Sequence, residues 1–100
     1  MKIEFSKDFE KSVRKLSGKA LTTVRTVVQE VIDARNIYEI TNCKKLVDYD
    51  FVYRIRIDNY RVFFVFHIHI ENDIVLFQYL VSRGDAYNKK NLKRLRNKDK

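Results

Sequence analysis

The 100-residue chain contains no proline, no tryptophan and only two glycines. Proline and glycine are enriched in flexible linkers, so their scarcity argues against long unstructured stretches. A chain of this length buries about 60 to 65% of its unfolded surface and has room for one hydrophobic core. With 45% hydrophobic and 13% aromatic residues, it should fold as a single compact domain.

Cysteine is nearly absent as well, since Cys43 is the only one. A lone thiol cannot form an internal disulfide and lacks the partners of a zinc site, so we interpret Cys43 as a small, half-buried residue. No apolar run approaches the roughly 18 residues that a membrane-spanning helix needs. Residues 1–5 already include charged side chains, so the chain start lacks the apolar segment of a signal peptide. We therefore expect a cytoplasmic protein that is not inserted into a membrane.

Acidic residues are in the minority. The chain has 13 Asp and Glu against 21 Lys and Arg, which gives a formal charge of +8 and an isoelectric point near 9.7. A positive charge favours polyanionic partners such as nucleic acid, an acidic protein or an anionic membrane surface. Net charge alone does not choose among these partners, so the positions of the cations have to be considered.

The most informative cations lie in a predicted β-hairpin over residues 52–64. Apolar and basic residues alternate on both sides of Asp58-Asn59, with the period of two that sends neighbouring side chains to opposite faces of a sheet. Asp and Asn tolerate the left-handed backbone of a tight turn, so this dipeptide is the expected corner. Arg54, Arg56 and Arg61 then share one face of the hairpin.

This arginine face allows two interpretations. Sheets often carry exposed charges that only discourage edge-to-edge pairing, and the alternation alone fits that reading equally well. Guanidinium groups are also well suited to grip phosphate, because their planar fork of donors is always charged. The rest of the chain must decide between the two interpretations.

The periodicities predict an α+β fold with the element order β-α-α-β-β-β. The expected elements are a strand at 2–5, helices after Ser6 and Gly18, a helical turn at 37–40, a loop at 42–50, and hairpin and meander strands at 52–57, 60–70 and 74–81. Because strands and helices are segregated along the chain, both helices should pack on one face of an antiparallel sheet and leave the other face for function. Residues 1–88 should form the domain, and residues 89–100 a basic tail or marginal helix.

Residues 82–87 add further candidates at the end of the last strand. Alternate residues from Val75 to Arg83 have the same parity, so the meander is expected to bring Arg83 beside Arg61. Gly84 permits a bend that turns Tyr87 over the exposed face, where its ring can stack on a base. A tyrosine that merely covers the end of the sheet is the simpler interpretation.

Other chemistry has less support in the sequence. Asp85 can act as a general base or simply pair with Arg83. His67 and His69 share a face, but no third ligand is near them, so a metal site is not expected. The chain has no Ser-His-Asp order, no Gly-rich phosphate loop and no carboxylate cluster for magnesium, and we predict no cofactor.

Taken together, residues 1 to about 88 resemble the RelE/ParE superfamily of bacterial toxins. The resemblance rests on the element order and on the motifs Asn42-Cys43-Lys44-Lys45-Leu46, Tyr53-Arg54-Ile55-Arg56-Ile57, Asp58-Asn59-Tyr60-Arg61-Val62 and Arg83-Gly84-Asp85-Ala86-Tyr87. It implies a metal-independent endoribonuclease of the RelE branch, the toxin of a type II toxin-antitoxin pair that cuts messenger RNA in the ribosomal A site. The implied partners are messenger RNA, the ribosome and an acidic antitoxin, with operator DNA contacted only through the antitoxin.

The resemblance also implies roles for particular residues. The catalytic positions of the RelE branch match Arg54, Arg56, Arg61, Arg83 and Tyr87, and Lys44 and Lys45 are the candidates for RNA binding. Arginines at these positions would stabilise the charge that develops when a ribose 2′-hydroxyl attacks the adjacent phosphate. The tyrosine would hold the base or ribose in line for that attack.

One departure from the family affects the proton transfer. Family members often carry lysine at the positions of Arg54 and Arg56, and lysine can give up its proton, whereas arginine stays protonated. Both arginines are therefore purely electrostatic, and the base is Asp85, a histidine, a ribosomal group or solvent. Two alternatives remain, a ParE-like inhibitor of DNA gyrase and a noncatalytic RNA-binding module.

Overall fold

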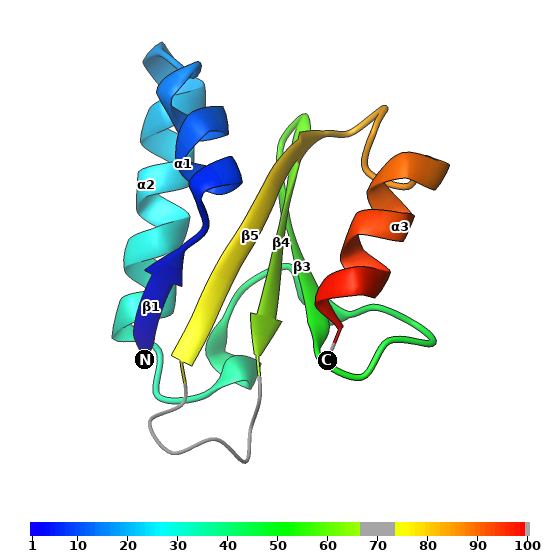
Figure 1. Ribbon diagram of the computed structural model, residues 1–100. Coiled ribbons are helices and arrows are strands. Elements are labelled where there is room, and N and C mark those ends of the chain that lie inside the picture. The colour runs from blue at the N-terminus through cyan, green and yellow to red at the C-terminus, as the bar shows by residue number, and fades with distance from the viewer. Residues whose placement is uncertain (67–73, 100) are drawn as a thin grey trace.

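The computed structural model describes residues 1–66 and 74–99, in which a five-stranded sheet has helices on both faces (Figure 1). The elements are β1 (Lys2–Phe5), α1 (Lys7–Arg14), α2 (Gly18–Asp33), the 3-10 turn η1 (Ile37–Glu39), β2 (Cys43–Lys45), β3 (Val52–Ile57), β4 (Tyr60–Phe66), β5 (Ile74–Ser82) and α3 (Lys89–Lys98). The predicted α+β class is confirmed. The predicted extension of β4 to Ile70, with His67 and His69, lies outside the described residues. No helix in the described part of the chain is long and apolar enough to cross a membrane.

Local signals set the bounds of the first helices. Ser6 caps α1, because its Oγ accepts a hydrogen bond of 3.0 Å from the backbone N–H of Phe9. Gly18 opens α2 with a φ of 56°, a left-handed value that glycine adopts without steric cost. At the corner of the hairpin, Asp58 takes a φ of 47° between β3 and β4. The helices expected after Ser6 and Gly18 and the expected hairpin corner are therefore confirmed.

The sheet is mixed, with the strand order β1-β5-β4-β3-β2. β1 pairs in parallel with β5, from Lys2 opposite Ile74 to Phe5 opposite Phe77. The predicted antiparallel pairing therefore holds for β3, β4 and β5, but the pair at this edge is parallel. Parallel neighbours need a long crossover connection between them, and here the rest of the sheet and both helices separate the two strands along the chain. That pairing depends on the whole topology and leaves no local signal.

Part of the predicted loop at 42–50 is a strand. β2 pairs antiparallel with β3 and places Lys44 opposite Arg54 at the other edge of the sheet. A strand of three residues is too short to show a period in the sequence. Short, charged strands are also the form in which sheet edges resist pairing with other chains.

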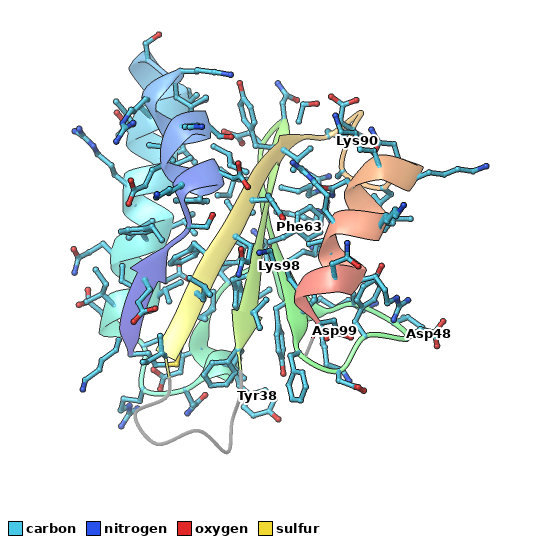
Figure 2. All side chains as sticks on the ribbon, viewed as in Figure 1. Tyr38, Asp48, Phe63, Lys90, Lys98 and Asp99 are labelled. Carbon is cyan, nitrogen blue, oxygen red and sulfur yellow. The ribbon has the colours of Figure 1, made fainter. Side chains whose placement is uncertain are left out.

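The side chains of β4 enter two separate cores. Phe64 faces α1 and α2 and packs in a cluster with Phe9 and Val24. Phe63 faces the opposite way, between the sheet and α3 (Figure 2), in a cluster with Leu95. Both phenylalanines have an exposed fraction of 0%. The sheet is therefore buried on both faces along its central strand.

The expectation of an open second face was wrong, because α3 covers part of it. Asn88 caps this helix by accepting a hydrogen bond of 2.8 Å from the N–H of Asn91. Leu95 has an exposed fraction of 0%. The guanidinium of Arg94 lies 4.0 Å from the centre of the Tyr79 ring, a cation–π contact that adds to the apolar packing.

The loop before β3 holds the same helix from its other end. The guanidinium of Arg96 lies 3.9 Å from the centre of the Tyr49 ring. Asp99 follows α3, and its carboxylate accepts hydrogen bonds from the backbone N–H groups of Asp50 and Phe51, the shortest at 2.9 and 2.6 Å. Figure 2 shows Asp99 at this loop, which also carries Asp48.

A β-bulge in β5 overturns the predicted parity of that strand. Two consecutive residues of β4 pair with Tyr79 and Phe77, so Gln78 is the extra residue. Tyr79 joins the core beneath α3, whereas Val75 and Phe77 belong to the core beneath α1 and α2. The prediction that alternate residues from Val75 to Arg83 share one face was wrong, because an inserted residue leaves no mark in an apolar strand.

Replacement of Leu95 by alanine tests the packing of α3. Because Leu95 is fully buried, Leu95→Ala should lower the free energy of unfolding by about 2 to 5 kcal/mol. Urea denaturation followed by circular dichroism measures this change. Asn97→Ala, at an exposed position of the same helix, should change stability by less than about 0.5 kcal/mol. Equal effects of the two substitutions would show that α3 is not held by its apolar face.

Candidate nucleic-acid interface

A cleft of about 290 Å³ opens on the side of the sheet that carries α3. We call it the basic cleft, and it is lined by Lys44, Lys45, Leu46, Val47, Tyr49, Arg54, Tyr87 and Leu92. Four of these residues, Lys44, Lys45, Arg54 and Tyr87, are candidates from the sequence. The fold thus brings together candidates from β2, β3 and the segment before α3, which are far apart along the chain.

Tyr87 lies over the sheet, in the segment between β5 and α3. Its ring meets the ring of Phe63 edge to face, with the centroids 6.1 Å apart and an interplanar angle of 89°. Ala86 next to it is fully buried, and its carbonyl accepts a hydrogen bond from the side-chain amide of Asn91. Half of Tyr87 remains exposed, at 50%. One edge of the residue is therefore anchored while the rest is available to a ligand.

Arg54 lies in the middle of β3, directly opposite Phe63 on β4. Its Nη1 donates a hydrogen bond of 3.3 Å to the carbonyl of Asn42, and the side chain is partly buried. On the other side it neighbours Lys44 of β2. Ion pairs in the described part of the chain join only Arg14 to Glu10 and Arg35 to Glu39. Lys44, Lys45 and Arg54 therefore form no ion pair with any carboxylate of the described residues.

Arg56 and Arg61 lie outside the basic cleft, nearer the corner of the hairpin. They are directly opposite each other on β3 and β4, an arrangement of like charges that destabilises a sheet. Nη1 of Arg61 donates hydrogen bonds to the carbonyls of Asp58 and Tyr60, at 3.2 and 2.9 Å. These bonds draw the guanidinium toward the corner and fix its orientation. Together with Arg54, the two residues make one face of the hairpin strongly cationic.

Arg83 and Asp85 lie where the chain leaves β5. The backbone N–H of Arg83 donates a hydrogen bond of 2.7 Å to the carbonyl of Asn59, so Arg83 is placed beside the hairpin corner with its side chain exposed. The carboxylate of Asp85 accepts a hydrogen bond of 3.1 Å from the hydroxyl of Ser82. The structure has no ion pair between Asp85 and Arg83, so that alternative was wrong, and neither residue lines the basic cleft.

Cys43 on β2 is half-buried, as the sequence predicted. Burial raises the pKa of its thiol to about 12, and the nearby charge of Arg54 opposes this shift only in part. The thiol is therefore neutral at physiological pH and is not a nucleophile.

The remainder of the described surface offers less chemistry. A larger groove of about 550 Å³ lies between α1 and α2, is mainly apolar and contains none of the candidate residues. Within residues 1–66 and 74–99, no group of three His, Cys, Asp or Glu side chains is placed to hold a metal ion.

The sequence analysis did not predict the apolar residues that line the basic cleft, which are Leu46, Val47, Tyr49 and Leu92. The hydroxyl of Tyr49 donates a hydrogen bond of 3.2 Å to the carbonyl of Leu92, which joins the loop before β3 to α3. The sequence does contain a signal for α3, since Asn88 is a good helix cap and Leu92 and Leu95 follow it at helical spacing. It was weak because only two large apolar residues stand among many lysines and arginines.

The chain has a RelE-like fold, which agrees with its resemblance in sequence to the RelE/ParE superfamily. Over 88 residues the chain is 26% identical to Toxin RelE3 of Methanocaldococcus jannaschii, covering 87% of this chain and 96% of the relative. It matches a chain of the RelB-RelE antitoxin-toxin complex from Methanococcus jannaschii with a TM-score of 0.67 and 23% identity, covering 83% and 93% of the two chains. For the archaeal RelE-RelB complex from Pyrococcus horikoshii OT3 the TM-score is 0.66 and the identity 20%, covering 83% and 94%. No protein-family model matches the chain.

The raised pKa of Cys43 predicts slow alkylation. Only the thiolate reacts, and a pKa of about 12 makes the thiolate rare near neutral pH. At about pH 8, iodoacetamide should modify the folded protein roughly a thousandfold more slowly than the chain unfolded in urea. Mass spectrometry of quenched samples measures both rates. Similar rates in the two states would contradict the burial of this thiol.

Proposed function

We propose that this protein is the toxin of a type II toxin-antitoxin pair and that it cleaves messenger RNA on the ribosome. The observation that carries the proposal is the position of Tyr87, half-exposed and anchored on Phe63, in the same cleft as Arg54, Lys44 and Lys45. The RelE name of its curated relative and the toxin-antitoxin complexes among its structural neighbours support the same class.

Exposed aromatic rings beside cations are the usual means of binding a single strand of nucleic acid. The ring stacks on a base, and the cations hold the phosphates on either side of it. Tyr87 provides the ring, and Arg54 projects from the middle of β3, a strand that is paired on both sides, rather than from a loop. A phosphate bound there is held in a fixed position, which is the requirement for catalysis by orientation.

The proposed reaction is an internal transesterification of the RNA. The ribose 2′-oxygen attacks the adjacent phosphorus, the bond from phosphorus to the 5′-oxygen breaks, and the products are a 2′,3′-cyclic phosphate and a 5′-hydroxyl. Negative charge builds up on the phosphate oxygens in the transition state. Arg54 in the basic cleft, with Arg56, Arg61 and Arg83 toward the hairpin corner, would stabilise that charge.

The proton of the 2′-hydroxyl needs an acceptor, and the arginines cannot provide one. Asp85 already accepts a hydrogen bond from Ser82 and lies outside the basic cleft. A ribosomal group or solvent is therefore a better acceptor than Asp85, and the 5′-oxygen takes up a proton as it leaves. This assignment predicts weak cleavage of free RNA and stronger cleavage on a ribosome that orients the message.

An acidic antitoxin would neutralise such a toxin by covering its cationic face. The basic cleft and the hairpin arginines form a surface whose charge is not balanced within the described residues, and that surface attracts acidic segments. An antitoxin that is partly disordered and folds on binding can wrap such a surface. Its contact with this chain would also connect the toxin to operator DNA.

Substitution of Arg61 tests the proposed catalysis. Loss of one preorganised donor typically reduces the rate by about 10² to 10³, so Arg61→Ala should cut message on translating ribosomes that much more slowly. Arg25→Ala, which removes an exposed arginine of α2 on the opposite side of the sheet, is the matched control and should keep full activity. Circular dichroism verifies that both variants are folded, and mapping of message ends measures the rate.

The same assay separates the alternatives. Codon-phased cuts by the wild-type protein would support the proposed function. Intact message together with loss of DNA supercoiling by gyrase would indicate a ParE-like inhibitor instead. Full cleavage by Arg61→Ala would count against the proposed site.

A further inference from the structure

The first turns of α3 carry two exposed lysines beside the basic cleft, Lys89 and Lys93, for which the proposed chemistry has no use. Residues three and four apart share a face of a helix, and Lys89 lies three positions before Leu92, which lines the cleft. Arg96 lies four positions after Leu92 and stacks on Tyr49, another residue of the cleft wall. Lys93 lies between Lys89 and Arg96 on this stripe. The stripe therefore runs along the flank of α3 that borders the basic cleft.

These lysines do not serve the stability of the helix. Six of the ten residues of α3 are Lys or Arg, and its first turn has no acidic residue. Cations near a helix N-terminus oppose the helix dipole, and Lys89 and Lys90 occupy that end. Neither Lys89 nor Lys93 takes part in an ion pair with a residue that the structure describes. Their charge is available to an anionic ligand, which would relieve the repulsion.

Cations also border the cleft on its opposite side. Lys44 and Lys45 of β2 line that side, and Arg54 and Tyr87 lie between β2 and α3. Lys89 follows Tyr87 by only two residues and is exposed, so a phosphate next to a base stacked on the ring would lie in the neighbourhood of this lysine. A ring flanked by cations on two sides suits a strand that carries a base and phosphates in alternation.

We propose that Lys89 and Lys93 hold phosphates of the RNA strand on the α3 side of the basic cleft, next to the nucleotide that stacks on Tyr87. This inference rests on the proposed function and extends its binding site from the reacting phosphate to the neighbouring ones. The two lysines position the strand and take no part in the chemistry. An acidic protein segment is a less fitting ligand, because it would leave the exposed ring of Tyr87 without a stacking partner.

The test measures RNA binding separately from cleavage. A single-stranded RNA oligonucleotide with 2′-O-methyl groups at every position cannot be cleaved by 2′-oxygen attack, and its binding to the full chain is followed by fluorescence anisotropy over a range of salt concentrations. For a single strand the slope of log K against log salt is negative, and each lysine that no longer neutralises a phosphate reduces the magnitude of the slope by about 0.7. The double variant Lys89→Gln/Lys93→Gln should therefore reduce the magnitude of the slope by about 1.4, so that its affinity relative to the wild-type protein falls about 25-fold for each tenfold decrease in salt concentration.

The matched control is Lys7→Gln/Lys11→Gln, which removes the same charge from exposed positions of α1 on the opposite side of the sheet. It should retain the wild-type slope. Equal slopes for both double variants would overturn the inference, as would a wild-type protein that does not bind the methylated RNA. If the α3 variant alone has a reduced slope while the wild-type protein fails to cut message on ribosomes, the inference holds and the proposed nuclease activity is wrong.

Discussion

The burial of β4 on both faces is the constraint on which the rest of the structure depends. Phe63 and Phe64 are neighbours, have exposed fractions of 0% and enter different cores. A strand of this kind needs cover on both sides, which α1 and α2 provide on one face and α3 on the other (Figure 1). To reach its place, α3 must follow a chain segment that crosses the end of the sheet, and that segment carries Tyr87 onto Phe63. The packing of the second core therefore also positions the aromatic residue of the candidate site.

The face of the sheet that α3 covers combines an apolar part and a cationic part. Val52, Phe63 and Tyr79 belong to the core beneath α3. On the same face, Arg54 lies directly opposite Phe63, and Arg56 and Arg61 lie nearer the hairpin corner. Arg56 directly opposite Arg61 raises the energy of the free protein. Burial of apolar side chains on both faces compensates for this cost, so the fold can keep these two like charges side by side. Binding of an anionic ligand to these arginines is therefore electrostatically favourable, because it relieves their mutual repulsion.

Much of the candidate site could be predicted because its residues follow local rules. Alternation in β3 and β4 places Arg54, Arg56 and Arg61 on one face, and the register confirms that placement. The grouping of Lys44 and Lys45 with Tyr87 in one cleft could not be derived in the same way. It depends on the pairing of β2 with β3 and on the docking of α3 against the distant loop before β3. Hydrogen bonds such as the one from Asp50 to Asp99 connect those segments and have no counterpart in a sequence pattern.

The sequence by itself determined the α+β class, the cap at Ser6, the break at Gly18 and the corner at Asp58-Asn59, because each depends on the conformational preference of a few adjacent residues. Tertiary structure decided the parallel pairing of β1 with β5, the bulge at Gln78 and the position of α3. In each of these cases the local pattern is compatible with more than one arrangement. The choice was made by the burial of apolar area between distant segments, which is a property of the whole chain.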